Sequence, residues 1–419
     1  MTPTMDQYLI TGGTPLRGTV AAGGAKNSAL KIMAATLLAP GMHRIGRVPR
    51  IADVETMGRV LGRLGAQADF IGDRVTITVP PGLATEAPYD LVRQMRASII
   101  VLGPLLARTG RARVAMPGGC NIGSRKIDLH LRGLERMGAE ISFDHGYLDA
   151  RVDGLRGAHI SLDFPSVGAT ENLLMAATLA KGTTLIENAA REPEIQDLAA
   201  FLQAMGAEIS GAGTPAIEIG GVTELRAADH AVVGDRIEAG TFLIAGAATG
   251  GDVTVTGVVP EHLDLVLAKL SDAGVNVDAG ATRVRVSLEG RPDPVDFVTL
   301  PYPGFPTDLQ PQMMVLLATA RGTSIATENV FESRFMFVDE LIRMGADIRT
   351  EGHHAVIRGG LGLQAAQVHA PDIRAGAALV IAGLAAAGDS EVTGIGYIDR
   401  GYEGSERKLA GLGAAIRRA

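Results

Sequence analysis

One hydrophobic pattern, Leu-x-x-(apolar)-Gly-(Ala/Val), recurs six times along the chain. Its copies read LGRLGA, LERMGA, LQAMGA, LSDAGV, LIRMGA and LAGLGA, and their glycines are Gly65, Gly138, Gly206, Gly274, Gly345 and Gly413. Successive glycines lie 73, 68, 68, 71 and 68 residues apart. This near-constant spacing predicts six internal repeats of one structural unit.

The residues before each of these glycines have the spacing of an amphipathic helix. In the first copy the apolar positions are Val54, Met57, Val60, Leu61 and Leu64. We expect Asp53 to be the N-cap of this helix and Gly65 to end it in a left-handed conformation. After the glycine, the alternating segments QADFIG and DRVTITV predict a β-hairpin.

A second helix, apolar on nearly every side, is predicted in each repeat. Its sequences include ALKIMAATLL, SIIVLGPLLA and ALVIAGLAAA, and each copy ends at a further glycine: Gly41, Gly110, Gly182, Gly251, Gly322 and Gly388. A helix without a polar face must be buried. Each repeat is therefore expected to run strand–helix–strand–helix–strand–strand, and the fold class is α/β.

The length suggests how the repeats are grouped. A chain of 419 residues exceeds one ordinary core, and three repeats suit the usual size of a domain. The expected division lies between copies three and four, near Val232–Gly234. An active site is then expected in the cleft between two domains.

Composition narrows the classes of partner and compartment. The net charge, 39 − 46 = −7, argues against nucleic acid or an anionic membrane as a general partner. One cysteine cannot form an internal disulfide, the N-terminal residues carry no export signal, and no apolar stretch reaches the length of a membrane span. We expect a cytoplasmic, soluble protein. The histidines lack metal-ligand spacing, so no metal site is predicted.

Charged residues recur just before the buried helices. Aligning the repeats on their second glycine brings together Lys26, Arg96, Arg236, Asp308 and Arg374. A cation at a helix start opposes the helix dipole by about 0.3–1 kcal/mol unless an anion compensates it. Helix starts with Lys and Arg are typical phosphate or carboxylate sites, although each residue alone is equally compatible with a solvated or ion-paired loop.

The single cysteine, Cys120, lies in the segment PGGCNIGSRKIDLH. A free cysteine is most often a small buried hydrophobe. Here the preceding glycines and the following Arg125 and Lys126 indicate a polar loop instead, in which nearby cations increase thiol reactivity. We interpret Cys120 as a functional, reactive thiol rather than a core residue.

Three other motifs have both a structural and a functional interpretation. The pair Lys26-Asn27 in GGAKNS binds an anion or lies in a loop, and the P-loop pattern is absent. Asp308 in FPTDLQ is an N-cap or a general base whose pKa is raised by partial burial. The pair Asp372 and Arg374, and the segment around Arg400, form local ion pairs or line the cleft.

Ten segments, among them GGAKNSALKIMAATLLA, PGGCNIGSRKIDLH, SVGATENLLMAATLA, FPTDLQPQ and IDRGYE, carry a resemblance to a known family. In their order and spacing the chain resembles the UDP-N-acetylglucosamine enolpyruvyl transferases from about Tyr8 to its C-terminus. The resemblance implies two inside-out α/β barrel-like domains of three repeats each. Residues 25–233 would form one domain, and residues 1–24 with 234–419 the other, with the N-terminal strand crossing over.

The implied reaction is enolpyruvyl transfer from phosphoenolpyruvate to the 3′-hydroxyl of UDP-N-acetylglucosamine, the first committed step of peptidoglycan precursor synthesis. By the resemblance, Cys120 protonates the methylene carbon, Asp308 lies at the sugar hydroxyl, and Lys26, Arg125 and Arg400 hold phosphoenolpyruvate. Further substrate contacts are implied at Asn27, Arg96, Lys126, Ile127, Asp128, Leu129, Ser166, Val167, Val330, Arg334, Asp372 and Arg374. No cofactor, metal or obligate protein partner is implied.

Two related activities and one unrelated one are the alternatives. Enolpyruvylshikimate-phosphate synthase resembles this fold and reaction but uses shikimate 3-phosphate, and the GGC loop and the SVGATEN strip argue against it. A paralogue could transfer enolpyruvate to another nucleotide. A repeat protein that only binds nucleotides is disfavoured because Cys120, Asp308, Lys26 and Arg400 are all present.

Overall fold

The computed structural model describes residues 6–92, 95–116 and 127–419. These residues form two compact units. The N-terminal unit comprises residues 24–233, and the C-terminal unit comprises the residues up to Gly23 together with Gly234–Ala419. Each unit has its own hydrophobic core.

Three four-stranded sheets belong to the N-terminal unit. Their strand orders are β14(His230–Ala231)-β3(Gly41–Gly46)-β5(Arg74–Val79)-β4(Gln67–Ile71), β6(Glu86–Ala87)-β7(Arg111–Ala115)-β9(Tyr147–Arg151)-β8(Glu140–Asp144) and β10(His159–Ser161)-β11(Thr183–Glu187)-β13(Ala216–Gly220)-β12(Glu208–Ser210). In every sheet the first pair is parallel and the other two pairs are antiparallel.

The C-terminal unit repeats this topology three times. Its sheets are β2(Arg17–Ala21)-β15(Asp252–Thr256)-β17(Arg283–Ser287)-β16(Asn276–Ala279), β18(Phe297–Thr299)-β19(Thr323–Glu328)-β21(His354–Arg358)-β20(Asp347–Glu351) and β22(Gln367–His369)-β23(Asp389–Thr393)-β1(Gln7–Thr11)-β24(Ala415–Arg418). Strands β1 and β2 come from the start of the chain. They complete two sheets whose other strands lie more than 200 residues later.

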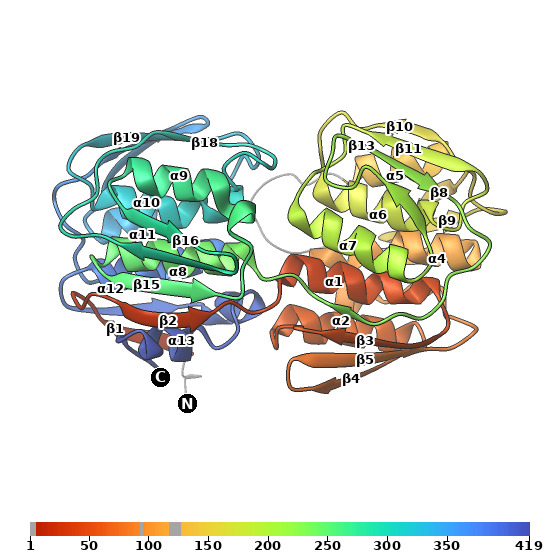
Figure 1. The fold of residues 1–419 in the computed structure, drawn as a ribbon, viewed down its shortest axis with the longest axis horizontal. Helices are drawn as coiled ribbons and strands as arrows, with labels where there is room; N and C mark the ends of the chain where they lie inside the picture. Colours follow the sequence, from red (N-terminus) through yellow and green to blue (C-terminus); the bar gives the residue numbers. More distant parts are fainter. Residues whose placement is uncertain (1–5, 93–94, 117–126) are drawn as a thin grey trace. The chain divides into compact units, whose positions relative to one another are not determined.

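Two sets of helices alternate with these strands. The set that is apolar all round comprises α1(Lys26–Ala35), α4(Leu102–Thr109), α6(Val167–Ala177), α8(Arg236–Ala248), α10(Gln310–Ala318) and α12(Ile373–Ala385). Almost every residue of these helices is buried, as their sequences predict. Figure 1 shows helices inside each unit and strands on its outside, which is the inside-out arrangement expected from the sequence.

The amphipathic set comprises α2(Ala52–Arg63), α5(Asp128–Arg136), α7(Pro193–Ala204), α9(Asp264–Asp272), α11(Val338–Arg343) and α13(Ser405–Gly411). The remaining helices are short: η1(Thr36–Leu38), α3(Tyr89–Val92), η2(Arg96–Val101), η3(Pro260–Leu263), η4(Thr307–Leu309) and η5(Ile395–Arg400). The six glycines of the repeat pattern follow the amphipathic helices, and all have positive φ, between 80° and 108°. The six left-handed helix ends predicted from the sequence are therefore confirmed.

Three details of the helix ends differ from the sequence-based expectation. In the fourth repeat the left-handed residue after α8 is Gly250, with φ 64°, and not Gly251. Gly251 is required for another reason, because a Cβ there would lie 2.0 Å from the carbonyl oxygen of Leu16. In the fifth repeat Gly322 does not have a positive φ, and α10 already ends at Ala318. The predicted cap of α2 is also wrong: the N-cap is Ile51, and Asp53 lies inside the first turn.

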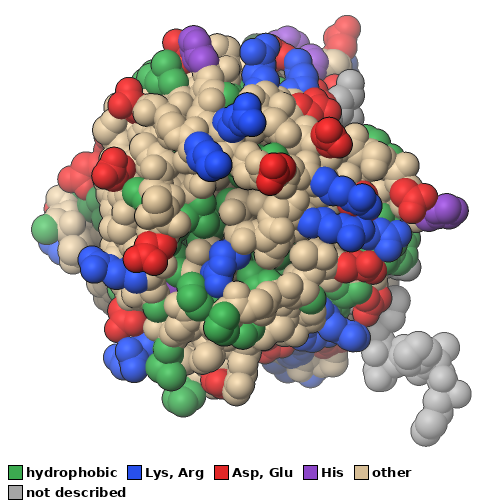
Figure 2. All heavy atoms as spheres, turned by 90° about the vertical axis from the view of Figure 1, so that its right-hand side faces the viewer, with side chains coloured by type: hydrophobic (Ala, Val, Ile, Leu, Met, Phe, Trp, Pro, Cys, Tyr) green, Lys and Arg blue, Asp and Glu red, His purple; other side chains and the backbone are tan. Residues whose placement is uncertain are grey.

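Charges on the outside of the protein are mixed in sign. On the face drawn in Figure 2, Lys and Arg side chains alternate with Asp and Glu side chains rather than forming one basic or acidic patch. Across the described part of the chain, no helix has both the length and the apolar character needed to cross a membrane.

Candidate active site

The start of α1 carries the first predicted site residues, Lys26 and Asn27. Lys26 is the first helical residue, and the N-cap, Ala25, provides no side-chain cap. The Lys26 Nζ lies 2.7 Å from the Asp53 carboxylate, and both side chains are more than 90% buried. Asp53 is therefore the counterion of Lys26. The ion pair explains why the Asp53 side chain does not cap α2. It also stabilises a lysine at the start of a helix, a position where the helix dipole favours an anion.

A second buried lysine supports the same turn. The Lys31 Nζ donates to the backbone oxygen of Asn27 at 2.7 Å and lies 3.4 Å from a carboxylate oxygen of Glu171 in α6. Burial raises the pKa of Glu171 to about 7, against the opposing effect of Lys31. The sequence pattern did not single out Lys31 or Glu171, because both lie within an apolar run.

The predicted nucleotide-binding strip comes from the starts of α5 and α6, which pack on each other. Ser166 is the N-cap of α6, and its side chain accepts from the backbone N–H of Ala169. Asp128 opens α5 and forms an exposed ion pair with Arg132. A Cβ on Gly168 would come within 3.3 Å of the His130 ring, so the two segments lie close together.

The remaining members of the strip occupy neighbouring positions. Ile127 is the buried N-cap of α5, Leu129 is half-buried in its first turn, and Val167 is the first residue of α6. Behind them, the Asn172 side chain contacts the His130 ring at 3.0 Å and accepts from the backbone N–H of Gly103 at 2.7 Å. One amide thereby links α4, α5 and α6.

Asp308 in the C-terminal unit is held by two arginines. Its carboxylate oxygens lie 2.9 Å from the Arg334 Nη2 and 2.9 Å from the Arg374 Nη2, and Arg374 Nε adds a third contact at 3.0 Å. The arginine side chains are 1% and 7% exposed, whereas that of Asp308 is 25% exposed. Asp308 lies in η4 and does not cap α10, whose N-cap is Leu309 without a side-chain bond. Two nearly buried guanidinium groups therefore hold the Asp308 carboxylate in place.

Arg374 also contacts the interior of its unit. Burial disfavours its charge, but Asp308, Tyr402 and Asp235 together outweigh this effect and keep the pKa of Arg374 above its ordinary value. Its guanidinium lies over the ring of Tyr402, whose hydroxyl contacts Thr241 at 3.1 Å and accepts from Gln312 at 3.2 Å. Asp372 does not form the local ion pair considered above. It caps α12 through the N–H groups of Arg374 and Ala375.

The loop between β19 and α11 carries Val330 and Arg334. Both backbone N–H groups at its start, of Val330 and Phe331, donate to one oxygen of Glu328 at 2.8 and 3.0 Å. The other oxygen of Glu328 accepts from the Thr307 hydroxyl, next to Asp308. Glu328 thus links the start of this loop to the segment that carries Asp308, although the sequence pattern did not identify it.

Arg400, the last of the described candidates, is half-buried at the end of η5.

Several predicted residues lie outside the described part of the chain. Cys120, Arg125 and Lys126 belong to segment 117–126, and of Arg96 only the backbone position at the start of η2 is described. The described candidates form two sets, one in each unit. Among residues 6–92, 95–116 and 127–419, no cluster of His, Cys, Asp and Glu could hold a metal ion.

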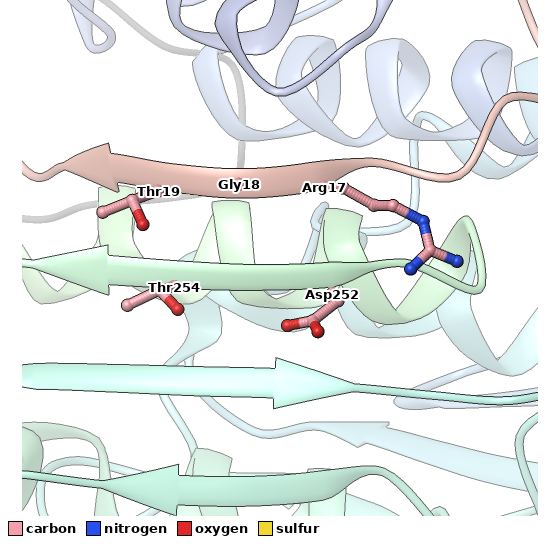
Figure 3. A pocket seen from close by; sticks show the side chains of 5 residues that line it. All are labelled: Arg17, Gly18, Thr19, Asp252 and Thr254. Atoms are coloured by element: carbon pink, nitrogen blue, oxygen red, sulfur yellow. The ribbon is translucent and has the colours of Figure 1, made fainter.

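An open depression on the outer face of β2 and β15 is lined by Arg17, Gly18, Thr19, Asp252 and Thr254 (Figure 3). Its carboxylate is already engaged, because Asp252 forms two hydrogen bonds with Arg285, at 2.8 and 2.5 Å. These bonds hold the pKa of Asp252 below its ordinary value. We therefore do not consider this depression an active site.

Comparison with known proteins agrees with the inside-out fold and its six repeats. The family model described as EPSP synthase (3-phosphoshikimate 1-carboxyvinyltransferase) matches residues 10–409. The solved enolpyruvyl transferase NikO from Streptomyces tendae superposes with a TM-score of 0.90 at 28% identity, covering 100% of this chain and 99% of that one. An EPSP synthase from Acinetobacter baumannii shares the fold, with a TM-score of 0.76 at 18% identity over 99% of this chain and all of the other. Fold and sequence together define an enolpyruvyl transferase.

Curated relatives specify the family further. The chain is 55% identical over 416 residues to UDP-N-acetylglucosamine 1-carboxyvinyltransferase 2 of Carboxydothermus hydrogenoformans. It is 54% identical over 413 residues to the UDP-N-acetylglucosamine 1-carboxyvinyltransferases of Corynebacterium jeikeium and Mycobacterium bovis. Each alignment covers 99% of both chains. The chain belongs to the UDP-N-acetylglucosamine 1-carboxyvinyltransferase family, which confirms the resemblance found in the sequence.

Proposed function

We propose that the protein transfers the enolpyruvyl group of phosphoenolpyruvate to the 3′-hydroxyl of UDP-N-acetylglucosamine and releases phosphate. The observation that carries this proposal is the identity of about 55% to 1-carboxyvinyltransferases over 99% of the chain. We further propose that the reaction takes place in the cytoplasm, as the first committed step of peptidoglycan precursor synthesis and hence of cell-wall growth and division.

The proposed chemistry is an addition followed by an elimination. A proton from the Cys120 thiol is added to the methylene carbon of phosphoenolpyruvate, and the adjacent carbon, now oxocarbenium-like, is attacked by the sugar hydroxyl oxygen, whose proton passes to a base. The methyl group of the adduct then loses a proton, which restores the Cys120 thiol, while the C–O bond to phosphate breaks and the phosphate takes up the proton held by the base. This sequence restores the double bond and yields the enolpyruvyl ether and inorganic phosphate.

Two anionic substrates in one site require several cations and the exclusion of water. We assign Lys26, Arg125 and Arg400 to the phosphoenolpyruvate anion, with Asn27 and Arg96 as further substrate contacts. For Lys26, the buried position at an uncapped helix start supports this assignment. Its counterion Asp53 keeps the lysine in place before an anion arrives.

We assign Asp308 to the hydroxyl of the sugar. The three contacts from Arg334 and Arg374 support this assignment, because they fix the carboxylate in one orientation while a quarter of its side chain stays exposed. The strip of Arg125, Lys126, Ile127, Asp128, Leu129, Ser166 and Val167 is assigned to the nucleotide. Arg334, Asp372 and Arg374 are assigned to the surroundings of the reacting anion, and Val330 is assigned as a further substrate contact.

The decisive assay measures phosphate release from phosphoenolpyruvate in three reactions. They contain UDP-N-acetylglucosamine, shikimate 3-phosphate or no acceptor. We expect release only with UDP-N-acetylglucosamine, and release only with shikimate 3-phosphate would refute the proposal.

A second experiment tests the acid assigned to Cys120. Cys120→Ser should lose most turnover, whereas Cys120→Asp should retain part of it, because a carboxylic acid can still donate a proton. An equal loss in both variants would contradict the assignment. The epoxide fosfomycin, which resembles phosphoenolpyruvate, should alkylate Cys120, and an unmodified thiol in the mass spectrum would contradict its placement in the anion site.

A further inference from the structure

Within residues 6–92, 95–116 and 127–419, the chain passes from one unit to the other at two peptides, and backbone hydrogen bonds join the segments that contain them. The first is the Gly23–Gly24 peptide and the second is the Val233–Gly234 peptide. The Asp235 N–H donates to the Gly23 oxygen at 2.9 Å, and the Ala25 N–H donates to the Val233 oxygen at 2.7 Å. Each unit thus contributes one of the two bonds that join the crossing segments.

A largely buried carboxylate in α7, Asp197, holds the second crossing within the N-terminal unit. One of its oxygens accepts from the backbone N–H of Val233 at 3.1 Å. The other contacts the His230 Nε2 of β14 at 2.8 Å, and the side chain is only 10% exposed. Asp197 therefore binds both β14 and the residue at which the chain leaves this unit.

The same carboxylate also reaches the first turn of α1. The Ser28 hydroxyl donates to the Asp197 oxygen that accepts from Val233. Ser28 is fully buried and directly follows Lys26 and Asn27. One carboxylate thereby connects the turn that carries the proposed anion-binding residues to the returning crossing.

This connection matters because the first turn of α1 has no cap of its own. Its N-cap, Ala25, has no side-chain bond, and the first turn contains no acidic residue. Side-chain contacts hold this turn instead: Asp53 of α2 binds Lys26, Lys31 of α1 binds Asn27, and Asp197 of α7 binds Ser28. Bonds to a charged acceptor are roughly twice as strong as neutral ones, which makes Asp197 an effective anchor.

We propose that Asp197 is a positioning residue for enolpyruvyl transfer. It fixes the helix turn that carries Lys26 and Asn27 relative to the backbone at Val233. The inference rests on the proposed function, since it concerns how the anion-binding turn is set. Asp197 acts through Ser28 and Val233 and does not touch substrate.

The test compares Asp197→Asn with wild type and with Asp296→Asn. Asp296 is a suitable control because its carboxylate also accepts from a backbone N–H, that of Ile325, but it lies in the other unit, directly before β18. The asparagine keeps the size of the side chain but loses its charge and one acceptor. We expect kcat/KM for phosphoenolpyruvate to fall about tenfold in Asp197→Asn and to change less than twofold in Asp296→Asn. An Asp197→Asn enzyme within twofold of wild type would overturn the proposal.

Two further readouts separate positioning from general stability. The Val233 amide and the amides of residues 25–30 should exchange hydrogen faster in Asp197→Asn, while those of α4 remain unchanged. Uniformly faster exchange would indicate a structural effect only and would overturn the proposal. In addition, Ser28→Ala should lose activity, and the double variant should lose little more than Asp197→Asn alone, whereas fully additive losses would refute coupling through Ser28.

These outcomes are distinguishable from failure of the proposed function. If wild type released no phosphate with any acceptor, the proposed function would fail. The exchange of the Val233 and α1 amides would still report whether Asp197 holds them.

Discussion

Replacing Asp308 by alanine should destabilise the C-terminal unit because it removes the carboxylate that two buried guanidinium groups share. At 2.9 Å and an effective dielectric constant of about 20, each contact contributes an attraction of about 6 kcal/mol before desolvation is counted. Removing one partner of a buried pair generally costs about 3–5 kcal/mol. Because the Asp308 side chain is 25% exposed, we expect the lower end, about 3 kcal/mol.

The measurement is urea unfolding followed by circular dichroism, combined with hydrogen exchange of α12 peptides to report on the C-terminal unit. A loss of about 3 kcal/mol corresponds to a fall in Tm of about 6–12 °C for a unit of this size. Asp252→Ala is the matched control, because its partner Arg285 is 51% exposed and such surface pairs contribute about 1 kcal/mol or less.

A double variant tests whether the cause is electrostatic. Asp308→Ala combined with Arg374→Met removes one of the two cations, so the double variant should recover at least half of the lost stability. A loss below about 1 kcal/mol in Asp308→Ala would refute the reasoning. So would a double variant whose losses simply add, since that result would show that no repulsion had been relieved.

Two further predictions concern stability. Burial raises the pKa of Glu171 from 4.5 to about 7, so between these values the folded protein keeps a proton that the unfolded chain releases. The free energy of unfolding should therefore fall by roughly 3 kcal/mol as the pH rises through this window. In urea titrations at pH 5 to 8, Glu171→Gln should abolish this part of the pH dependence. Parallel pH profiles for the wild type and the variant would contradict the prediction. Gly221→Ala should lower the free energy of unfolding by more than 2 kcal/mol, because the new Cβ would lie 1.6 Å from the Ala180 oxygen. Gly62 in α2 has open space around it, so Gly62→Ala should raise the free energy of unfolding by about 0.5–1 kcal/mol. Thermal unfolding of both variants checks this pair, and equal effects would show that the close backbone approach at Gly221 is not limiting.

Several features of the fold could be predicted from local spacing alone. The six left-handed glycines, the amphipathic helices before them and the buried second helices all follow from residues within one turn or one hairpin of each other. Helical periodicity and glycine's tolerance of positive φ depend only on residues close together in the chain. The local sequence is therefore enough to predict these elements. The positions of Lys26, Arg236 and Arg374 at helix starts could be predicted for the same reason.

Partners that are distant in sequence were decided only by the tertiary structure. Asp53 has the spacing of an N-cap, yet the nearby Lys26 ammonium binds its carboxylate. Asp308 has an equally plausible capping position, but it meets Arg334 and Arg374 from two other segments. Local propensity is worth about 1 kcal/mol at a cap, whereas leaving a buried cation unpaired costs several, so the ion pairs prevail.

The same distinction applies to the architecture and to the proposed positioning residue. The pattern predicts six similar repeats, but nothing in it states that β1 and β2 complete sheets from the opposite end of the chain. Asp197 is an ordinary polar position of an amphipathic helix until folding brings Ser28, His230 and Val233 to its carboxylate. The sequence by itself determined the repeating unit, because neighbouring residues specify it. Only the tertiary structure decided which charges meet, because that depends on contacts between segments far apart in the chain.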